Sequence, residues 1–206
     1  MKNILLTSYF AGTIGQFQKF MASQDTASKS ILFIDTASKV EEYTGYIDEA
    51  RAALVSLNYI ADTLDIASAD YIISRKKIQN ADAIFVAGGN TFYLLEKLRS
   101  QKLDKILIDK INTGTPYIGE SAGAIILSPD ITYVKKMDDS SLAPNLNTYT
   151  GLVVTNFSVL PHYLDAPFEG ETNAIFNYYH DKLNLLTLSN QETVSILNDN
   201  LLPKQK

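Results

Sequence analysis

The stretch Tyr117-Ile118-Gly119-Glu120-Ser121-Ala122-Gly123 joins a short apolar run to a helix-forming segment that continues to Leu127. This pattern is typical of a strand that turns sharply into a helix. Glycines on both sides of a serine let the chain turn tightly and expose the hydroxyl beside the first backbone N–H groups of the helix. The stretch therefore predicts a strand–turn–helix unit in which Ser121 is a candidate nucleophile.

Apolar runs alternate with amphipathic segments on both sides of this turn. We expect strands at 4–6, 31–34, 84–86, 117–118, 152–160, 185–188 and 193–197, and helices at 40–57, 91–101, 122–127 and 168–183. The segment 138–150 is rich in Ser, Asn, Asp and Thr and indicates a long surface loop. This alternation predicts an α/β fold with a doubly wound, mainly parallel sheet flanked by helices. No linker divides the chain, so we expect one domain over residues 1–206.

Composition narrows the classes of function. The chain has 206 residues, 46% of them hydrophobic and 20% charged, which is the balance of a soluble globular protein. A net charge of −5 with scattered lysines argues against nucleic-acid binding, because phosphate neutralisation needs a basic face. No apolar stretch approaches the roughly 18 residues of a membrane span, and the first apolar run breaks at Thr7-Ser8, too soon for a signal peptide. We therefore expect no membrane association and a cytoplasmic location.

The chain contains no cysteine, so thiolate zinc sites and cysteine nucleophiles are excluded. Hydroxyls, carboxylates and two histidines remain, and we expect neither a metal nor a cofactor. His162 is the better candidate for a base that activates Ser121, because it follows the apolar run 157–160 and would stand at a strand end, where sites collect in open α/β sheets. His180 lies near the end of an expected helix, where a histidine commonly satisfies carbonyls.

A second glycine motif, Ala87-Gly88-Gly89-Asn90-Thr91, follows the expected strand 84–86. Two glycines between a strand and a helix let backbone N–H groups point into the space above the sheet, where they can stabilise an oxyanion. Gly89 and Ala122 are the candidate donors. The alternative is a simple turn capped by Asn90 or Thr91, and Asn90 is also a candidate contact for the substrate.

Three segments together resemble the peptidase E family of serine peptidases, which includes aspartyl dipeptidases and cyanophycinases. They are Phe85 to Leu95, Tyr117 to Ala124 and Leu160 to Tyr163. The resemblance implies a fold related to class I glutamine amidotransferases, a Ser–His–Glu triad, and hydrolysis of a peptide bond after an N-terminal aspartate without a cofactor. It assigns Ser121 as nucleophile and His162 as base and then acid. It also implies that the N–H groups of Gly89 and Ala122 form the oxyanion hole.

The sequence departs from the family pattern at two places. Asn190 stands where the triad glutamate is expected, with Glu192 two residues further on. We predict Glu192 as the acid, with Asn190 and Asp165 as alternatives. The segment 169–173 lacks the arginine that holds the substrate's aspartate in the family, so the preference for aspartate is expected to weaken. Glu120, if it faces the substrate, would favour a free α-amino group over an aspartate side chain.

The leading hypothesis is a serine exopeptidase or dipeptidase that acts on short peptides through an acyl-enzyme. One alternative is a binding or regulatory module of the same fold whose triad has decayed. Another is an esterase or a cyanophycinase-like hydrolase that uses the same serine. A lipase-like esterase is disfavoured because the order Ser, His, acid differs from that of the α/β-hydrolases. The sequence makes no prediction of the oligomeric state.

Overall fold

The computed structural model describes residues 1–26 and 28–206. These residues form a main sheet of seven strands in the order β3-β2-β4-β5-β1-β8-β9 and a second, two-stranded sheet of β6 and β7. The strands are β1 (Asn3–Thr7), β2 (Ser30–Ile34), β3 (Ile60–Leu64), β4 (Ile84–Val86), β5 (Tyr117–Glu120), β6 (Ser158–Leu160), β7 (Leu185–Thr187), β8 (Thr193–Leu197) and β9 (Asn200–Leu201). The α-helices are α1 (Ile14–Ala22), α2 (Gly45–Ser56), α3 (Tyr71–Asn80), α4 (Thr91–Ser100), α5 (Asp104–Asn112), α6 (Ala122–Ile125) and α7 (Glu169–Tyr179).

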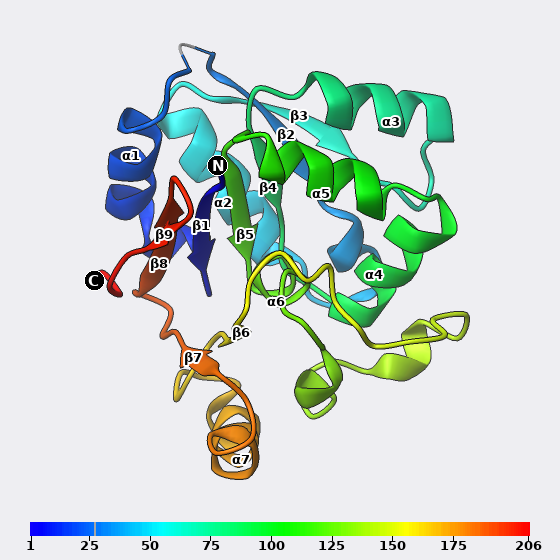
Figure 1. The fold of residues 1–206 in the computed structure, drawn as a ribbon, viewed down its shortest axis with the longest axis vertical. Coiled ribbons are helices and arrows are strands. Elements are labelled where there is room, and N and C mark those ends of the chain that lie inside the picture. The colour runs from blue at the N-terminus through cyan, green and yellow to red at the C-terminus, as the bar shows by residue number, and fades with distance from the viewer. Residues whose placement is uncertain (27) are drawn as a thin grey trace.

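Strands β1 to β5 are parallel, whereas β8 pairs antiparallel to β1, and β9 pairs antiparallel to β8. Alternate residues of each central strand enter two separate cores, because side chains alternate across a strand. Phe33 and Phe85 pack with the apolar faces of α1 and α2, while Ile34 and Val86 pack with α4 and α5 on the other face. Figure 1 shows the helices on the two sides of the sheet. This double burial explains why β4 reads as an uninterrupted apolar run.

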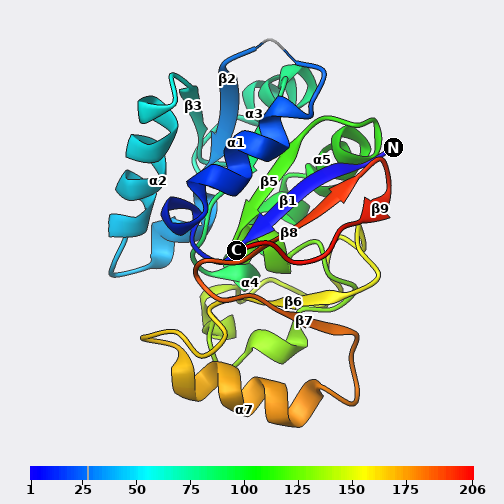
Figure 2. The same cartoon turned by 90° about the vertical axis from the view of Figure 1, so that its left-hand side faces the viewer.

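The carboxyl ends of β1, β4 and β5 lie side by side at one end of the main sheet, because β5 pairs in parallel with both β1 and β4. The smaller sheet lies against these strand ends. Figure 2 shows β6 and β7 between the main sheet and α7. The loops that leave β1, β4, β5 and β6 therefore meet, which is where binding sites form in open α/β sheets.

The predicted fold class is confirmed, with differences in individual elements, most of them in the last third of the chain. The expected strand 152–160 pairs only over Ser158–Leu160, because the backbone N–H groups of Leu152 and Val154 donate instead to Ile126 and Leu127 in the turn after α6. His162 is expected at a strand end of the open sheet, and it does follow a strand, β6, but β6 pairs with β7 in the separate sheet. The helices expected at 40–57 and 168–183 are shorter than predicted.

None of the helices among the described residues has the length and apolar character that crossing a bilayer requires.

Candidate active site

Ser121 occupies a strained turn between β5 and α6. Its φ is 47°, a left-handed value that a non-glycine residue rarely adopts, and its N–H donates to the Thr7 carbonyl at 2.9 Å. Gly123 allows the turn to pack against β4, since a Cβ at this position would lie 2.1 Å from the Val86 carbonyl oxygen. The phenol of the buried Tyr117 donates to the Gly123 carbonyl at 2.6 Å. Close packing on both sides therefore fixes a backbone conformation that alone would cost about 1–3 kcal/mol.

The hydroxyl of Ser121 meets the ring of His162. The Ser121 Oγ lies 2.9 Å from Nε2, and the Asn190 Oδ1 lies 2.7 Å from Nδ1 on the opposite side of the ring. An amide oxygen only accepts hydrogen bonds, so it selects the tautomer that carries its proton on Nδ1. Nε2 is then free to accept the proton of Ser121. The geometry is that of a serine activated by an oriented imidazole.

Residues far from His162 in the sequence hold it in place. The backbone N–H of His162 donates to the Ser8 Oγ at 3.1 Å, and the Ser8 hydroxyl donates to the Leu188 carbonyl at 2.9 Å. The N–H of Tyr163 donates to the same carbonyl at 2.9 Å. Ser8 directly follows β1 and Leu188 directly follows β7. The serine hydroxyl thus connects the edge of the main sheet to the smaller sheet and to the base.

The surroundings of His162 favour its neutral form. Burial lowers the pKa of the imidazole below its usual value, while the hydrogen bond to Asn190 and the negative charge of Asp165 act in the opposite direction. A lowered pKa keeps the ring unprotonated at neutral pH, as a general base requires. The phenyl ring of Phe168 lies 5.0 Å away, centroid to centroid, and covers the imidazole.

The structure corrects the expectation for Glu192, because Asn190 rather than Glu192 contacts His162. The Glu192 carboxylate accepts the N–H of Ser189 at 2.9 Å and lies 3.4 Å from the Lys204 ammonium. It closes the turn that follows Leu188, whereas Asn190 at the tip of that turn reaches the ring. Asp165, the other alternative, accepts the backbone N–H of Asn190 at 2.5 Å.

Two residues that the sequence analysis assigns to substrate binding have other partners. Glu120 is 2% exposed, and its Oε1 accepts the N–H of Phe10 at 2.8 Å beneath the turn. Asn90 is 1% exposed, and its Oδ1 caps α4 by accepting the N–H of Tyr93 at 2.9 Å. Both side chains turn into the protein because each has a backbone N–H to satisfy. Neither is placed to face a substrate, which corrects that expectation.

Two glycines follow β4, and the first of them, Gly88, lies next to Ser121. A Cβ on Gly88 would lie 3.4 Å from that of Ser121 and 3.4 Å from the Tyr46 ring. Gly89 has a φ of 126° and packs against the Ala37 backbone, so no other residue fits there. Ala122 opens α6, and the N–H of a first helical residue has no acceptor within its own helix. The glycine turn and the start of α6 thus flank the serine.

Carboxyl groups dominate the charge around Tyr46. Burial raises the pKa of its phenol, and Glu41, Glu120 and Asp138 raise it further. Burial also raises the pKa of Asp138 to about 6, although the Thr91 N–H, 2.9 Å from Oδ2, opposes this. Arg51 and Arg99 are engaged elsewhere, with Asp35 and with carbonyl groups of residues 148–151. The part of the chain that the structure describes contains no cluster of three or more metal-ligating side chains.

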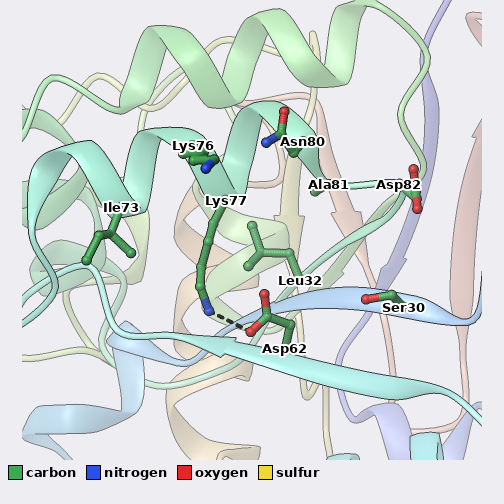
Figure 3. A pocket seen from close by; sticks show the side chains of 9 residues that line it. All are labelled: Ser30, Leu32, Asp62, Ile73, Lys76, Lys77, Asn80, Ala81 and Asp82. Atoms are coloured by element: carbon green, nitrogen blue, oxygen red, sulfur yellow. Dashed lines mark hydrogen bonds and ion pairs between the residues drawn. The ribbon is translucent and has the colours of Figure 1, made fainter.

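A pocket of about 440 Å³ lies at the opposite end of the parallel strands, between β2, β3 and α3. Figure 3 shows Lys77 of α3 reaching across it to Asp62 of β3, at 2.5 Å. The pocket opens near Ser30, the first residue of β2, whereas ligands of open α/β sheets bind at the carboxyl ends. The catalytic candidates are absent from its lining, so it is separate from the candidate active site.

Sequence reasoning missed Ser8 and gave Asp165 only as an alternative acid. A signal for Ser8 exists, because it is a polar residue directly after an apolar strand, at the end where sites collect. His180 lies outside the site, as expected. Its Nδ1 contacts the Phe176 carbonyl at 2.9 Å near the end of α7.

A serine–imidazole pair on a strand-to-helix turn of a parallel sheet defines the class of serine hydrolases. The chain belongs to peptidase family S51, whose family model matches residues 4–202, and it is a serine peptidase. It is 40% identical to the uncharacterized peptidase Lmo0363 of Listeria monocytogenes, covering 100% of this chain and 99% of that protein. It is also 31% identical to peptidase E of Haemophilus influenzae, covering 82% and 77% of the two chains.

Solved structures agree with this assignment. A crystal structure of a Listeria monocytogenes protein with the provisional description peptidase E superposes with a TM-score of 0.93 at 38% identity, covering 100% of this chain and 98% of that one. A peptidase from an acI-B1 Actinobacterium gives a TM-score of 0.68 at 18% identity, covering 95% and 83%, and supports the fold alone.

Proposed function

We propose that the protein is a serine exopeptidase that cleaves short peptides through an acyl-enzyme formed on Ser121. The observation that carries this proposal is the unbroken row of contacts from the Ser121 hydroxyl through the His162 ring to the Asn190 amide, at 2.9 Å and 2.7 Å. A binding module with a decayed triad has no reason to keep a strained serine in register with a base.

In the proposed reaction, the Ser121 Oγ attacks the peptide carbonyl carbon while its proton passes to the His162 Nε2. The N–H groups of Gly89 and Ala122 stabilise the oxyanion. When the C–N bond breaks, Nε2 returns the proton to the leaving amine. Water then attacks the ester, again through His162, and releases the carboxylic acid and the free serine. Each step needs proton transfer at Nε2 and no redox partner.

Asn190 takes the place of the triad acid in this mechanism. Its amide oxygen orients the ring and selects the tautomer, as asparagine does in papain-like Cys–His–Asn sites. An amide does not neutralise the imidazolium that forms during the reaction. Any compensating negative charge therefore comes from another group.

We also propose that the enzyme has no strict requirement for an N-terminal aspartate. The segment 169–173 contains no arginine, and Arg51 and Arg99 are bound to other partners. The carboxylates near Tyr46 would repel an aspartate side chain. A free α-amino group suits these surroundings better.

The test combines covalent labelling with a panel of dipeptides. Wild-type protein should react with a fluorophosphonate at Ser121 and hydrolyse Ala-Leu and Lys-Leu at least as fast as Asp-Leu. Ser121→Ala should abolish labelling, and Ser121→Ala and His162→Ala should each lower hydrolysis by at least about 10⁴-fold while keeping the fold. Hydrolysis retained in Ser121→Ala would exclude the mechanism. A clear preference for Asp-Leu would exclude only the proposed specificity.

A further inference from the structure

Asp165 is the charged group that faces His162 without touching the reacting atoms. It follows the histidine in a tight turn, in which the Asp165 N–H donates to the His162 carbonyl at 3.0 Å and the Phe168 N–H donates to the Asp165 carbonyl at 2.9 Å. These bonds fix the backbone of Asp165 relative to the backbone of His162. The position of Asp165 is therefore set by the same turn that sets the base.

The Asp165 carboxylate is bound to Asn190, the residue that orients the ring. Its Oδ2 accepts the backbone N–H of Asn190 at 2.5 Å, a charge-assisted contact. Asn190 in turn presents its Oδ1 to Nδ1 at 2.7 Å. One residue thus carries both the amide that meets the ring and the N–H that holds the carboxylate. The row of contacts runs Ser121, His162, Asn190, Asp165.

We propose that Asp165 is a positioning and charge-compensating residue that replaces the missing triad acid from one contact further away. Asn190 supplies the direct hydrogen bond to the ring, and Asp165 supplies the negative charge that an amide lacks. The two functions of a single triad carboxylate are divided between two residues. This inference rests on the proposed function, because it concerns the imidazolium that forms during acylation.

The other nearby carboxylates are engaged in different contacts. Glu192 is bound to the Ser189 N–H and lies beside Lys204. Glu120 accepts the N–H of Phe10 under the serine turn. The negative charge of Asp165 raises the pKa of His162, against the effect of burial. The electrostatics therefore agree with the geometry.

The rate of inactivation by phenylmethanesulfonyl fluoride, followed over pH, tests this inference without knowledge of the substrate. Sulfonylation forms a bond from the Ser121 Oγ to sulfur, expels fluoride and transfers the serine proton to His162. The midpoint of the pH profile therefore reports deprotonation of His162, and the limiting rate reports stabilisation of the imidazolium.

Asp165→Asn keeps an oxygen that can accept the Asn190 N–H but removes the charge. We expect the midpoint to move to lower pH, because the imidazolium loses a stabilising neighbour, and the limiting rate to fall about tenfold. Asp165→Glu keeps the charge, so the midpoint of its pH profile should lie between those of Asp165→Asn and wild-type protein. Asp181→Asn is the matched control: it removes the same charge from an exposed carboxylate beside His180, and it should leave both quantities unchanged.

An unmoved midpoint in Asp165→Asn would overturn the inference, including the case in which the rate falls, because that pattern describes a purely structural role. Should Asp165→Asn fail to fold, Asp165→Ser, whose hydroxyl oxygen can also accept the Asn190 N–H, is read by the same criteria. Wild-type protein that does not react at Ser121 would overturn the proposed function and the inference together. Reactive wild-type protein with an unmoved midpoint in the variant overturns the inference alone.

Discussion

The turn that carries Ser121 and the segment that carries His162 are built in different ways. The strand, the glycines and the helix start that form the serine turn all lie in one continuous run of sequence, 117–125, which packs beside the buried strand β4 in the main sheet. His162 depends on partners that are 154, 28 and 41 residues away, namely Ser8, Asn190 and Ser121. The nucleophile is thus specified by local pattern, whereas its activation depends on long-range contacts. Substitutions should separate these two contributions.

Among substitutions that keep both Ser121 and His162, the largest effect should come from the far side of the His162 ring. Asn190→Ala removes the acceptor of the Nδ1 proton, so the ring loses its tautomer and orientation. We expect kcat/KM to fall about a hundredfold with the fold preserved, which steady-state kinetics and circular dichroism can measure. The exposed neighbour Gln191 provides the control, because Gln191→Ala should change kcat/KM by less than about twofold. Equal activity in the two variants would contradict the assigned contact.

A second prediction concerns Glu120 under the serine turn. Burial raises the pKa of this carboxyl to about 7, and the Phe10 N–H opposes the shift. Between the unfolded pKa of 4.5 and the folded value, the native state keeps a proton that the unfolded chain has released. The free energy of unfolding therefore falls as pH rises through this window.

Glu120→Gln should remove about 2 kcal/mol of that pH dependence between pH 5 and pH 7. Urea denaturation at the two pH values measures it, with Glu171→Gln on the exposed face of α7 as the matched control. The same pH dependence in wild type and Glu120→Gln would show that the buried carboxyl does not titrate in this range.

The smallest effect should come from Glu192, which lies close to the site in sequence. Burial raises the pKa of its carboxyl, but the Ser189 N–H and the Lys204 ammonium lower it by more, so its contribution to stability is lost only as pH falls. Glu192→Gln should leave kcat/KM within about twofold and lower the unfolding free energy by no more than about 1 kcal/mol. A loss of activity as large as that of Asn190→Ala would restore Glu192 as the acid.

Sequence reasoning predicted the central strands well. β4 begins and ends where the apolar run 84–86 does, because a strand buried on both faces leaves an uninterrupted signal, and β8 matches the predicted range 193–197. It failed over 152–157, where the N–H groups of residues 152–155 donate to carbonyls in the turn after α6 instead of to a strand. The difference is one of partners: apolar character predicts burial, but only the fold decides which backbone accepts the hydrogen bonds.

The sequence by itself determined the α/β class, the sharp turn at Ser121 and the family, because glycine spacing and apolar periodicity act over neighbouring residues. Tertiary structure alone decided that Asn190 and not Glu192 meets His162, and that Ser8 and Asp165 support the pair. The turn after Leu188 presents Asn190 to the His162 ring and folds Glu192 back onto the N–H of Ser189. The sequence spacing between Asn190 and Glu192 carries no information about that choice, since the choice depends on hydrogen bonds formed with distant parts of the chain.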